Sequence, residues 1–156
     1  MSSQPIGLTT IPKLLPVTGT FALPFTAYYA ILSVRVVRER LQKEHYLGDN
    51  SSTATSDWKS YRNDRLYLLT RAHTNLAENV PLAFILAALV EVNGGSRKAL
   101  SWFLGGFLAM RVLHADFGIL SQGIGLGRPV GYWGSVGLLS AIAGYSAFLV
   151  KGYWGL

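Results

Sequence analysis

The hydrophobic residues of this chain are gathered into four long runs, which are separated by short polar segments. The runs cover approximately residues 14–37, 66–92, 99–120 and 130–150. An α-helix needs about 20 predominantly apolar residues to cross the hydrocarbon core of a bilayer. The pattern therefore predicts an all-α protein, with one membrane domain over residues 1–156 folded as a bundle of four transmembrane helices.

The polar segments between the runs predict loops and turns. Residues 48–57, with the sequence GDNSSTATSD, have no periodicity and predict the first loop. Asn-Gly-Gly-Ser at 93–96 predicts a tight turn, and GIGLGR at 123–128 predicts a further loop. Pro129 suits the first turn of the helix that follows. The first 13 residues lack the basic and short apolar segments of a cleaved signal peptide.

The composition agrees with a membrane protein and narrows the chemistry. Of the 156 residues, 50% are hydrophobic and 14% are charged, whereas soluble domains are about 25% charged. The formal net charge is +6, but the bases cluster at the ends of the apolar runs. Membrane topology explains that clustering, and we expect no nucleic-acid partner. The chain has no cysteine, so any thiol used in its chemistry must arrive with a ligand.

The distribution of basic residues predicts the orientation in the membrane. The side that carries the first and third loops holds Arg35, Arg38, Arg40, Lys43, Lys59, Arg62, Arg65 and Arg128. The opposite side holds Lys13, Arg97, Lys98 and Lys151. Because short loops rich in Lys and Arg stay in the cytoplasm, we expect the first and third loops to be cytoplasmic and both termini to lie on the other side.

The second run begins with polar residues that share one helical face. Arg71, Asn75 and Glu78 lie at i, i+4 and i+7. A charge inside a span costs roughly 2.5–3.5 kcal/mol, so these residues and Arg111 and Asp116 of the third run cannot all face lipid. They either pair with one another between helices or line a cytoplasm-facing pocket for a small charged ligand. The excess of arginine over acid favours a ligand with carboxylates or phosphates.

The histidines and glycines allow fewer interpretations. His114 lies one turn after Arg111, where it could donate a hydrogen bond, act as a base or simply pack. His45, His73 and His114 have no metal-ligand spacing, so we expect no metal site. No nucleophile-elbow pattern accompanies a Ser-His-Asp triad. The glycines of GIGLGR do not follow a strand, which argues against a dinucleotide or phosphate loop.

These motifs resemble the MAPEG family, the membrane-associated proteins in eicosanoid and glutathione metabolism. The resemblance rests on the run Arg71-Ala-His-Thr-Asn75, followed by Glu78 and Pro81, and on Arg111-x-x-His114 in the third span. It covers about residues 28–150, and the second-span motif is similar to those of microsomal glutathione transferase and microsomal prostaglandin E synthase. The resemblance implies a homotrimer of four-helix bundles that holds glutathione between neighbouring subunits on the cytoplasmic side.

The resemblance also implies roles for particular residues. The expected glutathione contacts are Arg35, Asn75, Glu78 and His114. Arg71 and Arg111 are expected to brace the pocket. Glutathione carries two carboxylates and one ammonium group, and Glu78 is the natural partner of the ammonium.

The family places a catalytic arginine near the start of the fourth helix, where it stabilises the glutathione thiolate. Arg128 is the candidate in this chain, because a nearby cation lowers the pKa of a thiol. Tyr132 or Ser135 could donate a hydroxyl hydrogen bond to the thiolate or could merely pack. The chain departs from its relatives at Thr74, where they often carry a base, and at Ala115 and Gly118, where some carry a hydroxyl or an aromatic ring.

The function that we expect is a membrane-embedded, glutathione-dependent transferase or peroxidase. It would act on a lipophilic electrophile or lipid hydroperoxide in the bilayer of the endoplasmic reticulum or another intracellular membrane. One alternative is a non-catalytic lipid-binding or scaffold member of the same family. Another is a small transporter or channel that uses the same embedded charges as an ion path.

Overall fold

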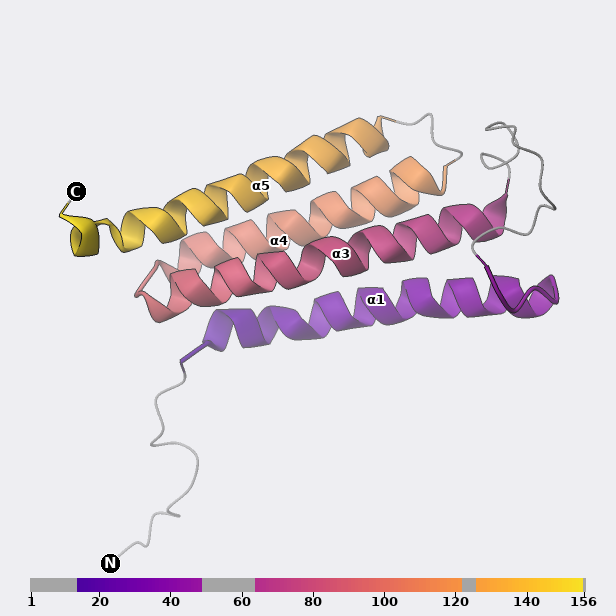
Figure 1. Cartoon of the computed structure of the whole chain (residues 1–156), viewed down its shortest axis with the longest axis horizontal. Helices are drawn as coiled ribbons and strands as arrows, with labels where there is room; N and C mark the ends of the chain where they lie inside the picture. Colours follow the sequence, from indigo (N-terminus) through magenta and orange to yellow (C-terminus); the bar gives the residue numbers. More distant parts are fainter. Residues whose placement is uncertain (1–13, 49–63, 122–125, 156) are drawn as a thin grey trace, which may run out of the picture.

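The computed structural model describes residues 14–48, 64–121 and 126–155, and four long α-helices run through this part of the chain (Figure 1). They are α1 (Pro16–Gln42), α3 (Arg65–Val92), α4 (Arg97–His114) and α5 (Gly127–Leu149). A π-helical segment, η1 (Ala115–Ile119), continues α4, and a short 3₁₀-helix, η2 (Lys151–Trp154), follows α5. The all-α, four-helix prediction is confirmed.

Helix α4 packs along α5 and α1 packs along α3, while α3 also contacts both α4 and α5. In Figure 1, α1 lies beside α3, α3 beside α4, and α4 beside α5. The helix bounds agree with the apolar runs to within a few residues, except that α1 continues to Gln42. The first apolar run ends at residue 37, and the five further residues form a polar extension of the same helix.

The polar extension of α1 is stabilised by ion pairs with the start of α3. Glu39 is buried and pairs with Lys43 at 3.2 Å and with Arg65 at 3.3 Å. Lys43 also lies 3.7 Å from Asp64. The Asp64 carboxylate accepts a hydrogen bond from the backbone N–H of Leu66 and so caps the first turn of α3. These contacts hold the ends of α1 and α3 together beside the predicted first loop, most of which lies outside the described residues.

The opposite end of α1 is capped by a side chain from another helix. The Glu91 carboxylate, near the end of α3, accepts hydrogen bonds from the backbone N–H groups of Val17 and Thr18 at 2.7 and 2.9 Å. It also accepts one from the Thr18 hydroxyl at 2.8 Å. The first N–H groups of a helix have no partner within the helix. Glu91 satisfies two of them and joins α3 to α1.

Between these ends the helices pack through aliphatic and aromatic side chains. Phe25, Ala83 and Phe107 meet where α1, α3 and α4 approach one another. Other large apolar residues face outward, such as Leu23, at 77% exposure, and Trp102, at 74%. Among the described helices, α1 and α3 are long and apolar enough to cross a membrane. An apolar exterior of this kind suits contact with lipid or with another subunit.

Candidate functional site

The candidate site lies where the end of α4 approaches the start of α5, and glycines make that approach possible. A Cβ at Gly131 would lie 2.6–2.7 Å from Cβ and backbone atoms of His114. A Cβ at Gly118 would lie 2.7 Å from the backbone of Arg128. Real Cβ atoms do not come this close, so each position requires glycine. The contact fixes the backbone of Arg128 against α4 and η1.

His114 strengthens this contact with a hydrogen bond across the two helices. Its Nδ1 lies 2.9 Å from the carbonyl oxygen of Arg128. A carbonyl only accepts, so Nδ1 carries the proton and donates it. In the neutral imidazole, Nε2 is then an acceptor that can bind a ligand proton. His114 itself is buried.

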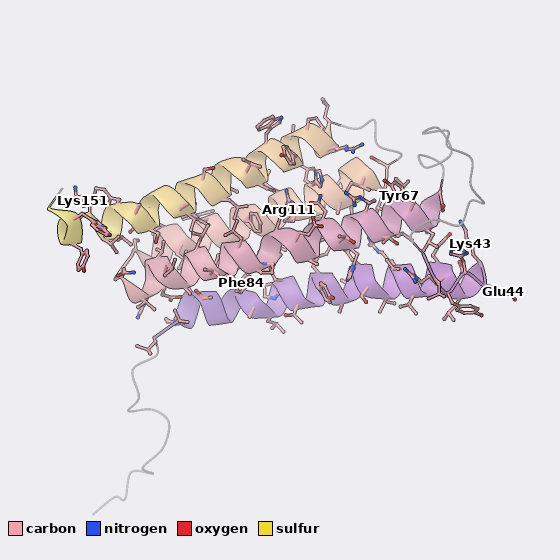
Figure 2. All side chains as sticks on the ribbon, in the orientation of Figure 1. Lys43, Glu44, Tyr67, Phe84, Arg111 and Lys151 are labelled. Carbon is pink, nitrogen blue, oxygen red and sulfur yellow. The ribbon has the colours of Figure 1, made fainter. Side chains whose placement is uncertain are left out.

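Arg111 lies deep inside the bundle, and its guanidinium is held by neutral partners. Figure 2 shows it between the two ends of the molecule, which Lys43 and Lys151 mark. Its Nε donates to the Ser135 hydroxyl and its Nη1 donates to Asn75 Oδ1, each at 2.8 Å. Its Nη2 donates to the carbonyl of Gly131 at 3.3 Å. Only 3% of the residue is exposed, so Arg111 joins α3, α4 and α5.

The hydrogen bonds of Arg111 also determine which polar groups of Asn75 and Ser135 remain free to bind a ligand. Asn75 uses its amide oxygen to accept from Arg111, which leaves its Nδ2 group as a donor for a ligand. Ser135 is fully buried, accepts from Arg111 and donates to the carbonyl of Gly131 at 2.6 Å. The hydroxyl of Ser135 is therefore occupied. Tyr132, at 48% exposure, is the other hydroxyl suggested by the sequence, and its ring lies 6.3 Å from that of His114.

Asp116 provides a second polar connection, between η1 and α1. Its Oδ2 accepts a hydrogen bond from the Tyr28 hydroxyl at 3.0 Å. Its Oδ1 forms an ion pair with Nη1 of Arg35. Arg35, an expected glutathione contact, thus lies beside η1, and its observed partner is an acid of the same chain.

Three other charged side chains of the predicted site are exposed on the surface of the subunit. They are Arg71, Glu78 and Arg128. Within the described residues, none of their charged groups forms a hydrogen bond or an ion pair. These groups are therefore free to bind a ligand or to extend toward the headgroups.

The sequence-predicted residues thus fall into two groups, those held by contacts within the chain and those with exposed side chains. Arg35, Asn75, Arg111 and His114 are fixed by contacts within the chain. Arg71 was expected to brace the pocket, but it makes no such contact within the described part of the subunit, and its role stays a prediction.

Asp116 is recognisable in the sequence as an acid inside an apolar run. Its partners are not, because Tyr28 and Arg35 lie 88 and 81 residues away along the chain.

The fold and the site define an integral membrane protein of the four-helix class, with a polar, arginine-rich site inside the bundle. Residues 18–148 match the model of the MAPEG family, and the chain belongs to that family. Members of the family are membrane proteins that generally use glutathione. Comparison with curated proteins and with solved structures gives no match.

Proposed function

We propose that this protein is a glutathione-dependent transferase or peroxidase that acts on a lipophilic electrophile or lipid hydroperoxide from the bilayer. The observation that carries the proposal is the set of unpaired, exposed charges, Arg71, Glu78 and Arg128, beside the satisfied Arg111 network. Glu78 complements the ammonium group of glutathione and Arg128 complements its thiolate, while Arg71 keeps its expected role of bracing the pocket. Charge-assisted hydrogen bonds of this kind are the strong ones in recognition.

Each residue of the site has a role in this proposal. Glu78 binds the ammonium group, and the Nδ2 group of Asn75 donates to the peptide. Arg35 binds a carboxylate, and Nε2 of His114 accepts a hydrogen bond. Arg111 orients Asn75 and the end of α4, which carries His114, and does not contact the ligand. These assignments extend the family's general use of glutathione to particular atoms of this chain.

Arg128 is the catalytic residue in this proposal. Its guanidinium stabilises the glutathione thiolate, and the Tyr132 hydroxyl can donate a further hydrogen bond to it. The backbone of Arg128 is fixed by His114 and Gly118, while its side chain is exposed. An anchored backbone with an unpaired guanidinium suits a group that acts on a ligand.

The site also supports assembly into a homotrimer in which glutathione lies between subunits. Arg71 and Glu78 face outward from α3, so the remaining wall of the pocket must come from outside the chain. We assign that wall to a neighbouring copy, with the first and third loops in the cytoplasm of an endoplasmic reticulum or other intracellular membrane. The proposed pocket then opens to the compartment where a soluble peptide is available.

Calorimetric titration of glutathione into the detergent-solubilised protein tests the binding step. Glu78→Gln should weaken binding about tenfold, because a charge-assisted contact becomes a neutral one. Glu44→Gln is the matched control, since Glu44 is also exposed but lies beyond the end of α1. An equal loss in both variants, or no binding to the wild-type protein, contradicts the proposed site.

Thiolate absorbance and conjugation of an aryl halide test the chemistry. Glutathione added to the trimer should raise the ultraviolet absorbance of the thiolate and should be transferred to the aryl halide. Glutathione binding with neither signal would show a binding protein without transferase activity.

A second candidate function, non-catalytic lipid binding, is favoured by a groove between α1 and α3. The groove has a volume of about 510 Å³, and its lining includes Phe25, Tyr29, Ala77 and Phe84. Such an apolar groove could hold a fatty-acid chain without glutathione. Binding of a fluorescent fatty acid that is unaffected by glutathione and is abolished by Ala77→Phe would support this candidate over the enzyme.

A further inference from the structure

We propose that Asp116 is a positioning residue of the site, which holds the Arg35 guanidinium where it can bind a carboxylate of the ligand. This inference rests on the proposed function, because it concerns glutathione as the ligand. The Asp116 carboxylate does not contact glutathione and acts only through Arg35.

The geometry of the Asp116 carboxylate is that of a clamp between η1 and α1. Each of its two oxygens has one partner, Arg35 for Oδ1 and Tyr28 for Oδ2. The two partners are seven residues apart and therefore lie on the same face of α1. Tyr28 is buried, at 9% exposure, so it gives the carboxylate a fixed support. The hydrogen bond from Tyr28 therefore orients the Asp116 carboxylate independently of Arg35.

The backbone around Asp116 is a π-helical turn, which begins directly after His114. The N–H of Leu120 donates to the carbonyl of Ala115 at 2.9 Å, a bond that spans five residues. Such turns widen the helix, change the direction of the side chains that follow, and occur frequently at functional sites. His114 and Asp116, two residues apart, point to nearly opposite sides of this helix, so His114 faces α5 while Asp116 reaches α1.

Arg35 keeps most of its binding capacity in this arrangement. A guanidinium has five N–H donors, and within the described residues only Nη1 has a bond, to Asp116. The Arg35 side chain is 40% exposed. The other donors are therefore available to a carboxylate. An arginine without this anchor would extend its long side chain toward the headgroups, away from the pocket.

The first test measures Arg35 without glutathione. An arginine-selective dicarbonyl reagent is applied to the detergent-solubilised protein, and modification of Arg35 is followed by mass spectrometry. Asp116→Ala should make Arg35 react several-fold faster, because the ion pair is lost. Tyr28→Phe removes the bond that supports the same carboxylate but keeps the ion pair, so the rate should rise by less than in Asp116→Ala. Equal rates in the wild-type protein and Asp116→Ala contradict the inference.

The second test is a double-mutant cycle on glutathione binding. Asp116→Ala and Arg35→Ala should each weaken binding by about tenfold, and the double variant should be no weaker than Arg35→Ala alone. Asp116→Asn keeps an oxygen that accepts from Arg35 and should restore part of the affinity. Tighter binding by Asp116→Ala would instead show that Asp116 competes with glutathione for Arg35. Additive losses would show that Asp116 acts independently of Arg35, and both results overturn the inference.

The two tests separate this inference from the proposed function. If wild-type protein binds no glutathione but Arg35 still reacts faster in Asp116→Ala, the proposed function is wrong while the clamp on Arg35 is real. If glutathione binds and Asp116→Ala changes only the melting temperature, Asp116 is purely structural and the inference is wrong. Thermal stability is measured for every variant, so that Asp116→Asn can replace Asp116→Ala if the latter does not fold.

Discussion

The two halves of this bundle, one where α1 begins and one where α4 ends, differ in whether the chain itself provides partners for their polar groups. Where α1 begins, Glu91 is buried and accepts three hydrogen bonds from Val17 and Thr18. Where α4 ends, Arg111 is equally buried and satisfied, but Arg71, Glu78 and Arg128 remain exposed and unpaired within the described residues. Glu91 thus has its partners within the chain, whereas the three exposed charges near Arg111 have none within the described residues.

This difference distinguishes structural polar groups from ligand-binding ones. A buried carboxylate whose hydrogen bonds are all made by its own chain contributes to stability and has nothing left for a ligand. An exposed charge with no partner in the chain can instead bind a ligand or extend toward the headgroups. We therefore expect substitutions in the Glu91 half to change stability, and substitutions of the exposed charges to change binding and turnover.

The largest effect is expected for Arg128→Ala. Removing a preorganised group that stabilises developing negative charge typically lowers turnover by about 10²–10³-fold. Stability should change little, because the Arg128 side chain is exposed and its guanidinium forms no hydrogen bond or ion pair within the described residues. Steady-state conjugation rates and melting temperatures measure the two effects. Arg97→Ala, an exposed arginine at the start of α4 in the Glu91 half, is the control that should retain full turnover.

Gly131→Ala should destabilise the protein by about 1–3 kcal/mol. The added Cβ would lie 2.6–2.7 Å from His114, so α4 and α5 must separate or distort. Chemical denaturation in detergent measures the change. Gly137→Ala, on the same helix with nothing within 4 Å of its Cβ, should be tolerated. Equal effects of the two substitutions would contradict the close contact at the site.

Glu91→Ala should lower the free energy of unfolding by about 1–2 kcal/mol, since the first turn of α1 loses its cap. Glu91→Gln keeps an amide oxygen as acceptor and should cost less. Neither variant should alter glutathione affinity in a calorimetric titration. A large change in affinity would contradict the distinction between the two halves, because it would show that the helix cap at one end affects ligand binding at the other.

The smallest effects on stability are expected for Arg71→Gln and Glu78→Gln. Both side chains are exposed and make no hydrogen bond within the described residues, so unfolding free energies should change by less than about 0.5 kcal/mol. Denaturation curves compared with that of Glu91→Ala provide the measurement. A loss as large as that of Glu91→Ala would show that the exposed charges have a structural role in the subunit.

Much of the fold could be predicted because helix formation in a membrane depends on local properties. A run of about 20 apolar residues must satisfy its backbone hydrogen bonds within itself, so it forms a helix wherever it occurs. The bounds of α3 at Arg65–Val92 accordingly agree with the predicted run at 66–92. The continuation of α1 to Gln42 was not predicted, because it depends on ion pairs of Glu39 with side chains of the same helix and of α3.

The sequence suggested members of the candidate site but could not predict their contacts. The motif that contains Arg71, Asn75 and Glu78 indicated the site, yet only Asn75 bonds to Arg111. The ion pair of Arg35 with Asp116 joins residues 81 apart in the chain, and no local pattern reports such a pair. Likewise, the sequence suggested Tyr132 or Ser135 as a hydroxyl donor, and the structure shows that the hydroxyl of Ser135 is already used by Arg111.

The sequence by itself determined the four-helix membrane class, the family and the residues that are costly in a bilayer, because each of these follows from local composition or from a short motif. Only the tertiary structure decided which of those residues are satisfied. Arg111 is satisfied by Asn75 and Ser135, Arg35 has one bond to Asp116, and Glu78 and Arg128 form no hydrogen bond or ion pair within the described residues. The physical reason is that hydrogen bonds act over about 3 Å, and that distance between residues far apart in the chain is set by how the helices pack.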